Sequence, residues 1–193
     1  MDVVTLEEVD QPISRLKTKN PAVARFSAGF IVVRPNSANL SELEVLLIRR
    51  AYGGSWAEAW ETPQGGNEEK DKTIRDTALR ETKEEAGLII QPENVFPLAY
   101  RITFEHKGSL MTSYQMIAMV DREADINISD EHLAWRFFDE EEVEQFGLFD
   151  KNKIQQDPHV MLQGKKEMLC HFFANEESLR KGEMEAIVSV KTQ

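Results

Sequence analysis

The chain has 193 residues, of which 41% are hydrophobic, and this is enough apolar material for the core of one globular domain. It carries 34 acidic and 23 basic side chains, so its formal net charge at pH 7 is -11. Extended nucleic acids and anionic membrane surfaces are bound through basic surfaces, and this charge therefore argues against both as partners. A small anionic ligand is still compatible, because a local basic patch or a metal ion would be enough to bind it.

Cysteine content and the N-terminal stretch indicate a reducing compartment. Cys170 is the only cysteine, which excludes a disulfide framework and a cysteine-rich zinc site, and such a thiol is usually a small buried hydrophobe. None of the four histidines stands four residues from another, so a helical histidine pair for zinc is absent from the sequence. The N-terminal MDVVTLEEVDQP is acidic without a long apolar run, and we expect neither a signal peptide nor a membrane span. A cytoplasmic location, with nuclear access left open, is the resulting expectation.

Residues 1–21 mix charged and apolar positions irregularly, and we expect an N-terminal arm or a short strand there. The main domain is expected over residues 22–175 and a tail over residues 176–193. Within the domain, residues 22–33 are dense in β-branched and aromatic side chains and predict a strand. After a turn, the apolar run at residues 43–50 predicts a second strand.

A connection rich in glycine and tryptophan follows over residues 51–72, and we expect it to surround a short strand. Long ordered connections of this kind are often functional. The pattern becomes helical over residues 73–86, where one row is formed by Ile74, Ala78 and Thr82. Gly87 suits the left-handed position that ends a helix.

The second half of the chain carries strand signals first and helix signals later. It predicts a hairpin around Gly108 over residues 95–120 and a loop with a short strand over residues 128–139. A short helix is predicted over residues 139–147, another helix within residues 158–182, and a tail or last strand over residues 183–193. The order of strands, one helix, more strands and then helices predicts a mixed α/β sandwich rather than a doubly wound parallel sheet.

The stretch ALRETKEEAGL places three glutamates on one side of the expected helix, at Glu81, Glu84 and Glu85. Like charges at this spacing destabilise an isolated helix, and the adjacent Arg80 and Lys83 are not expected to face them. The cluster is therefore expected to need an external cation. A hard divalent ion such as Mg²⁺, or Mn²⁺ in its place, binds carboxylate and phosphate oxygens together.

Immediately upstream, PQGG brings two residues without side chains towards the same place. Gly65 and Gly66 leave room for a phosphate, and a glycine carbonyl can itself bind a metal ion. We therefore expect a metal and phosphate site between this turn and the acidic helix.

Residues 66–88, GNEEKDKTIRDTALRETKEEAGL, resemble the Nudix box. The family pattern is Gly, five residues, Glu, seven residues, Arg-Glu, an apolar residue, any residue, Glu-Glu, any residue, Gly and an apolar residue, and it is matched by Gly66, Arg80, Glu81, Glu84, Glu85, Gly87 and Leu88. Two positions depart, because Lys72 stands in place of the first glutamate and Thr82 in place of the apolar residue. Because Lys72 cannot hold Arg80 as the family glutamate would, the partner of Arg80 is left open. Glu69 and Asp71 are the candidates to take the place of that glutamate.

The resemblance implies an α/β fold of the α+β type, a Nudix-like α-β-α sandwich with a mixed sheet and a loop-helix-loop box. It also implies that a metal-activated water hydrolyses a nucleoside diphosphate linked to another group. On the family pattern, Glu81 and Glu85 are metal ligands, Glu84 is a ligand or a water-positioning group, and the Gly66 carbonyl is a supporting ligand. Arg80 is expected to orient the box carboxylates rather than to contact the substrate.

Two further stretches, WETPQGG and ISDEHLAWRFFDEEEV, resemble the asymmetric diadenosine tetraphosphate hydrolases. PQGG is also similar to the RNA 5′-pyrophosphohydrolases. In the diadenosine tetraphosphate hydrolases a loop glutamate reaches the metal cluster, which makes Glu131 a general base or an additional ligand here. A solvated loop acid is the alternative for this residue. The resemblance thus implies magnesium-dependent cleavage of dinucleoside polyphosphates, a class of small nucleotide substrate.

Other substrates of the wider family remain open, namely RNA 5′ ends, diphosphoinositol polyphosphates, nucleotide sugars and isoprenoid diphosphates. A non-catalytic Nudix-like module that binds and senses a ligand is the alternative of another class. Lys72 is the only sequence feature in its favour. The sequence does not indicate the oligomeric state.

Candidates for phosphate binding are basic residues expected near the loop-rich edge of the sheet, namely Arg50, Lys107 and Arg136, each of which is otherwise a surface charge. Phe104 either stacks on a base or packs in the core. His132 either positions Glu131 or contacts phosphate. The three tryptophans are predicted to pack in the core or in loops, at Trp56, Trp60 and Trp135.

Overall fold

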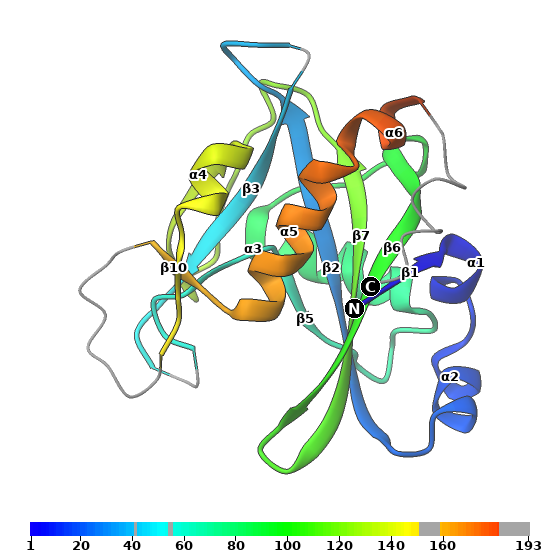
Figure 1. The fold of residues 1–193 in the computed structure, drawn as a ribbon. Coiled ribbons are helices and arrows are strands. Elements are labelled where there is room, and N and C mark those ends of the chain that lie inside the picture. Colours follow the sequence, from blue (N-terminus) through cyan, green and yellow to red (C-terminus); the bar gives the residue numbers. More distant parts are fainter. Residues whose placement is uncertain (41, 54–55, 151–158, 182–193) are drawn as a thin grey trace.

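The computed structural model describes residues 1–40, 42–53, 56–150 and 159–181, in which the strands form one sheet with helices on both faces (Figure 1). The strands are β1 (Asp2–Thr5), β2 (Val23–Pro35), β3 (Leu43–Arg50), β4 (Trp60–Glu61), β5 (Gln64–Gly66), β6 (Val95–His106), β7 (Ser109–Met119), β8 (His132–Phe138), β9 (Gly147–Leu148) and β10 (Val160–Met161). The helices are α1 (Leu6–Val9), α2 (Ile13–Lys19), α3 (Ile74–Ala86), the short 3-10 helix η1 (Pro92–Asn94), α4 (Glu140–Glu144), α5 (Gln163–Ala174) and α6 (Glu176–Lys181).

The elements predicted from the sequence are present. The two first strands, the hairpin, the central helix and the two later helices, α4 and α5, lie within the predicted segments or within a few residues of their ends. The glycine-rich connection contains two short strands, β4 and β5, where one was expected. The prediction for residues 183–193, a tail or a last strand, lies outside the described residues.

The sheet is mixed, as predicted. Its order is β1-β6-β7-β2-β3-β4-β10-β9, with β5 beside β2 and β8 beside β3. β2 pairs parallel with β7 and antiparallel with β3. The β6–β7 hairpin turns at Lys107 and Gly108, whose φ angles of 51 and 73 are those of a two-residue turn that matches the strand twist.

The sheet separates two hydrophobic cores, and β2 contributes to both because successive side chains of a strand point to opposite faces. Phe30 and Val32 lie in the core on the side of α3, whereas Ile31 and Val33 lie in the core on the side of α5. All four are fully buried. The predicted α-β-α sandwich is therefore confirmed.

The central helix α3 begins and ends where the sequence indicates. The Thr73 side chain accepts a hydrogen bond from the Asp76 amide, and the Asp76 carboxylate accepts one from the Thr73 amide, which forms a capping box. Gly87 ends the helix in the left-handed conformation, with a φ of 72. The predicted row is fully buried against the sheet, at Ile74, Ala78 and Thr82.

The N-terminal segment is packed on the sheet. β1 pairs antiparallel with β6, with Asp2 opposite Arg101, so the expected short strand is present at its start, whereas the helices α1 and α2 that fill much of the rest of residues 1–21 were not predicted. Val9 of α1 and Leu16 of α2 are buried in the core on the side of α3. This segment thus shares a core with the central helix.

Cys170 lies partly buried on α5, and burial raises the pKa of its thiol. Within the described part of the chain, no helix is long and apolar enough to cross a membrane.

Candidate functional site

The glycine turn and the acidic helix pack directly against each other. β5 runs antiparallel to β2, with Gly65 opposite Ala28, and β5 lies next to α3. A Cβ atom added to Gly65 would lie 2.3 Å from Glu81 Oε2, which is closer than real atoms approach. Any side chain at position 65 would therefore displace the Glu81 carboxylate from its present place.

Arg80 neutralises the acidic cluster from within. Its guanidinium donates hydrogen bonds of 2.7, 2.8 and 2.8 Å to Glu81 Oε1, Glu84 Oε2 and the Gly66 carbonyl. The prediction that the cluster lacks a cation of its own is therefore wrong. Arg80 and Glu84 stand four residues apart on one helix face, and the five donors of a guanidinium on a long side chain also reach the adjacent Glu81.

Asp71 holds Arg80 from the opposite side. Its side chain is only 4% exposed and accepts hydrogen bonds from Arg80 Nη2 at 2.8 Å and from Nε at 3.2 Å. Burial alone would raise the pKa of Asp71, but the hydrogen bonds, first of all that from Arg80, lower it overall. Lys72 contributes its main chain, whose amide donates to Asp76. Of the two substitutes considered for the missing glutamate, Asp71 is the one in contact with Arg80.

Glu85 is the buried member of the cluster. It is 7% exposed, and its Oε2 accepts a 2.6 Å hydrogen bond from the main-chain amide of Gln64. Burial, followed by the nearby charge of Glu61, raises the pKa of Glu85 to about 9. Burial also raises the pKa of Glu81, although Arg80 opposes this. Both carboxylates thus lie where extra positive charge would stabilise their ionised form.

Glu61 is a site residue that the sequence did not single out. It is 2% exposed on β4, and it accepts hydrogen bonds from Arg50 Nη1 at 2.5 Å and from Gln64 Nε2 at 3.0 Å. Its position within WETPQGG was the only signal available, because a single acid in a short strand gives no periodic pattern. Arg50, a predicted phosphate ligand, is therefore partly engaged by a buried carboxylate.

The Glu131 loop lies on the same side of the site. Glu131 is exposed, and its carbonyl accepts a hydrogen bond from the Ala51 amide. Burial would lower the pKa of Arg50, but Glu61 raises it overall, with smaller contributions from Glu85 and Glu131. All three carboxylates therefore lie within electrostatic range of Arg50.

His132 faces Glu85. Its Nε2 atom lies 3.9 Å from Glu85 Oε1, and its Nδ1 atom lies 3.2 Å from Ser129 Oγ. Nε2 is buried and, among the described residues, has no hydrogen-bond partner. Burial lowers the pKa of this imidazole. Its ring thus lies beside Glu85 without a hydrogen bond to it, and a role in positioning Glu131 or contacting phosphate stays a prediction.

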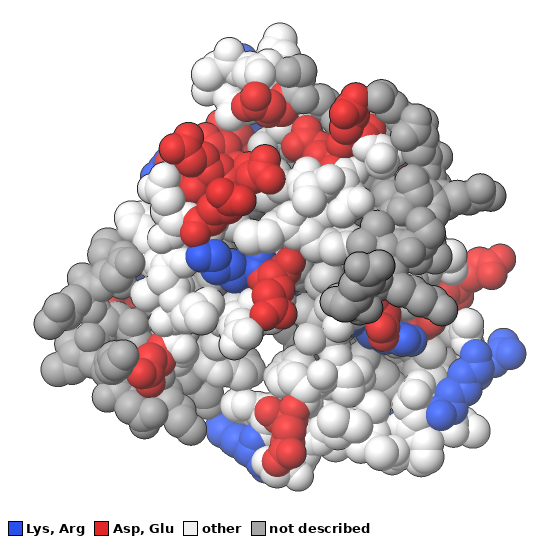
Figure 2. Space-filling model, viewed as in Figure 1, with Lys and Arg blue, Asp and Glu red and all other residues white. Residues whose placement is uncertain are grey.

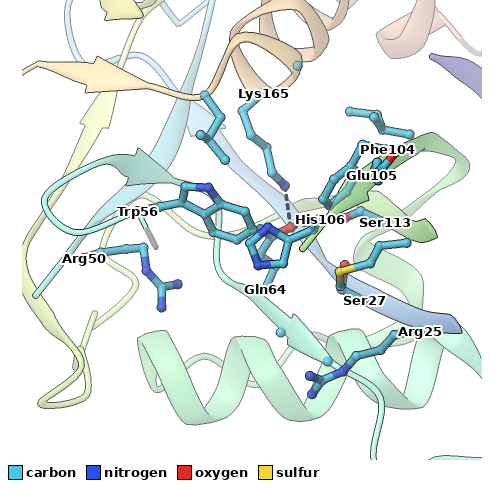
Figure 3. Close-up of a pocket in the computed structure, with 16 residues that line it drawn as sticks. Arg25, Ser27, Arg50, Trp56, Gln64, Phe104, Glu105, His106, Ser113 and Lys165 are labelled. Carbon is cyan, nitrogen blue, oxygen red and sulfur yellow. Dashed lines mark hydrogen bonds between the residues drawn. The ribbon is translucent and has the colours of Figure 1, made fainter. Parts of the chain in front are cut away.

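A pocket of about 520 Å³ opens beside the glycine turn (Figure 3). It is lined by Arg25, Ser27, Arg50, Trp56, Gln64, Gly65, Gly66, Ile102, Phe104, Glu105, His106, Met111, Ser113, Leu162, Gly164 and Lys165. Two of the predicted substrate-binding residues, Arg50 and Phe104, are in this wall. Lys165 and Gln64 are wall residues that sequence reasoning missed.

Two other predicted phosphate ligands lie away from the pocket wall. Lys107 is at the tip of the β6–β7 hairpin and is exposed. Arg136 forms an ion pair with Glu142 and lies over the ring of Phe138 at 4.6 Å. Neither side chain lines the pocket.

The three tryptophans occupy different environments. Trp60 is 6% exposed in the core on the side of α5, as predicted. Trp56 instead lines the pocket, where its ring lies 4.7 Å from that of His106. Trp135 is 41% exposed, and its ring lies at 87° to that of Phe137, with the centroids 6.4 Å apart. The prediction of core or loop packing is therefore wrong for Trp135, which is exposed on strand β8, and incomplete for Trp56, which gives the pocket an aromatic wall.

The donor atoms around the glycine turn suit a hard divalent cation in their chemistry, although their present spacing does not. They are carboxylate oxygens of Glu81, Glu84 and Glu85 and the carbonyl oxygen of Gly66, the donor type that Mg²⁺ prefers. As they stand, no three His, Cys, Asp or Glu side chains in the described ranges are spaced to hold an ion. Arg80 takes up the facing oxygens of Glu81 and Glu84 and supplies positive charge there.

Comparison with protein-family models gives a match to the NUDIX domain over residues 24–164. No curated protein sequence matches the chain. Among solved structures, a C. elegans Ap4A hydrolase in a binary complex is 18% identical, with a TM-score of 0.56, and the match covers 82% of this chain and 99% of that one.

Two further solved structures are similar. The MutT protein from Methanosarcina mazei Go1 is 18% identical with a TM-score of 0.58, and 79% of this chain and 94% of that chain are covered. The NUDIX domain of Shewanella oneidensis NrtR, complexed with ADP ribose, is 14% identical with a TM-score of 0.57, and 79% of this chain and 86% of that chain are covered. At these identities the likeness shows a shared fold.

Proposed function

The chain belongs to the Nudix family and is a phosphoanhydride hydrolase, and we propose that it cleaves dinucleoside polyphosphates such as diadenosine tetraphosphate with the help of Mg²⁺. The observation that carries this proposal is the placement of Glu85. This buried acid is held by the Gln64 amide at the glycine turn, beside a pocket with basic and aromatic walls.

The ion would be held by Glu81, Glu84, Glu85 and the Gly66 carbonyl, with Glu131 as an additional ligand. When bound, Mg²⁺ offsets charge on phosphoryl oxygens and lowers the pKa of bound water. Its charge would also favour the ionised form of Glu85, which burial disfavours.

The chain's own residues divide the remaining work. Asp71 fixes the guanidinium of Arg80, and Arg80 in turn fixes Glu81 and Glu84. Glu131 is exposed and free to approach a bound substrate, so it is the proposed proton acceptor, with Glu84 as the other candidate. A positioned general base typically contributes a factor of roughly 100 to 10,000 in rate.

Substrate binding is assigned to the pocket. Arg50 supplies positive charge next to Glu61, and Phe104 together with Trp56 and His106 offers ring surfaces for a base. Lys107 at the hairpin tip is proposed to contact the more distant part of a long polyphosphate substrate.

A substrate panel with product identification tests the proposal. The purified protein is incubated with Mg²⁺ and diadenosine tetraphosphate, triphosphorylated RNA, a diphosphoinositol polyphosphate, a nucleotide sugar or an isoprenoid diphosphate. We expect the highest kcat/KM for diadenosine tetraphosphate, with release of mononucleotides. A higher kcat/KM for another member of the panel would overturn the assignment of substrate.

A further inference from the structure

The pocket is basic although the protein is acidic. Acidic side chains gather over α4 on the face shown in Figure 2, in keeping with the net charge of -11. By contrast, the pocket wall contains three basic side chains, Arg25, Arg50 and Lys165, and one acidic side chain, Glu105. Such a local reversal of charge favours an anionic ligand.

Lys165 is the most deeply placed of the three cations. It stands in the first turn of α5, is 6% exposed, and points towards Gln64 (Figure 3). Its Nζ atom donates to Gln64 Oε1 at 2.5 Å and to Thr62 Oγ1 at 3.3 Å. An ammonium group has three donors, so these two neutral acceptors leave one donor for a ligand in the pocket.

The ammonium of Lys165 is costly to bury without an anion. No carboxylate of the described residues lies within ion-pair distance of it. Burial lowers its pKa to about 8, although the more distant charges of Glu61 and Glu85 act in the opposite direction. The group is therefore still mostly protonated at neutral pH, and a bound anion would relieve the cost of its burial.

Gln64 connects Lys165 to the acidic cluster. Its side-chain oxygen accepts from Lys165, while its main-chain amide donates to Glu85. One residue thus separates the buried cation from the buried acid. A phosphoryl group bound at the glycine turn, between them, would have acids on one side and Lys165 on the other.

We propose that Lys165 binds a phosphoryl oxygen of the nucleotide held in the pocket, and that it thereby selects ligands carrying a phosphate over the corresponding nucleosides. This inference rests on the proposed function, because it takes the pocket as the substrate site. Lys165 follows directly after residues 24–164, the segment matched by the family model, so that match does not include it.

Binding without turnover tests the proposal. Affinities for ADP and for adenosine are measured by calorimetry in the presence of a chelator, for the unchanged protein, Lys165→Met and Lys166→Met. Lys166 is the matched control because it is the next residue of α5, and its Nζ donates to the carbonyls of Glu144 and Phe146 instead of lining the pocket.

We expect Lys165→Met to weaken ADP binding at least about tenfold, the usual loss for a hydrogen bond to a charged group, and to leave adenosine binding unchanged. Lys166→Met should change neither affinity. Equal weakening of ADP and adenosine, or no weakening of either, would overturn the role of Lys165.

Lys165→Gln provides a second variant if Lys165→Met does not fold, as judged by thermal unfolding, and it should show the same selective loss. The measurement is independent of hydrolysis. A protein that discriminates ADP through Lys165 but hydrolyses no phosphoanhydride would contradict the proposed function and leave the phosphate contact standing.

Discussion

The main-chain amide of Gln64 donates a 2.6 Å hydrogen bond to Glu85, and this contact joins the glycine turn to the acidic helix. The Gln64 side chain continues the connection, because its Nε2 donates to Glu61 and its Oε1 accepts from Lys165. Gln64 therefore contacts both the acids of the site and Lys165 in the pocket wall.

Asp71 is expected to be essential for the orientation of Arg80. Asp71→Ala removes the buried partner of a guanidinium that is only 11% exposed, and we expect a loss of about 1–3 kcal/mol in the free energy of unfolding. We also expect kcat to fall about tenfold or more, because Glu81 and Glu84 are fixed by the same guanidinium. Chemical denaturation and steady-state kinetics measure the two effects.

Lys72→Ala is the matched control for Asp71→Ala. Lys72 occupies the position of the first box glutamate, and its hydrogen bonds to described residues are made by its main chain, which the substitution preserves. Its stability should change by less than about 0.5 kcal/mol. If both variants lose the same activity, Asp71 does not take over the role of the missing first glutamate of the box.

Gly65→Ala is expected to displace Glu81. The added Cβ would lie 2.3 Å from Glu81 Oε2, so the carboxylate has to move, and the disturbed hydrogen bond to Arg80 costs about 0.5–1.5 kcal/mol. Thermal unfolding and initial rates should both decline. Gly164→Ala serves as the stability control, because its Cβ would meet only Ile102, at 3.9 Å. An active, fully stable Gly65→Ala protein would refute the close contact.

The pH dependence of stability should report the buried charge of Lys165. Its pKa is about 8 when folded and 10.5 ordinarily, so between these values the unfolded chain holds a proton that the folded protein has released. Stability therefore contains a contribution that rises with pH across this window. Relative to Lys165→Met, which lacks it, the unchanged protein should gain about 2–3 kcal/mol between pH 7 and pH 10.

Denaturant titrations of both proteins at several pH values give this difference, which contains Lys165 together with the acids coupled to it. Glu61 and Glu85, the acids that act on Lys165, are present in both proteins. A difference that stays constant with pH would show that Lys165 is not buried as a charged group.

Local patterns were sufficient to predict α3. The helix has a buried row of residues four apart and a terminal glycine, both of which act within a few residues of the helix itself. The fixed spacing of Gly66 and the acids predicted that the turn and the helix meet. The strands followed similarly from their composition and from the turns between them.

Contacts between distant segments were not predictable in this way. Lys165 reaches Gln64 across 101 positions of the chain, and nothing in the composition of α5 marks one lysine as buried. Glu61 is buried because β4 pairs with β3, next to Arg50. The reach of Arg80 was missed for another reason, because spacing along a helix describes Cβ positions and not the end of a long side chain.

The dependence of hydrolysis on Mg²⁺ and on Glu85 tests the account most directly. Mononucleotide release from diadenosine tetraphosphate is followed while Mg²⁺ is added and then chelated, for the unchanged protein and for Glu85→Gln, whose amide oxygen can still accept from Gln64. We predict that the rate rises with Mg²⁺, stops on chelation and is at least about 100-fold lower in the variant, because the variant lacks a carboxylate ligand of the ion. A rate unaffected by the chelator or by the substitution would contradict the account.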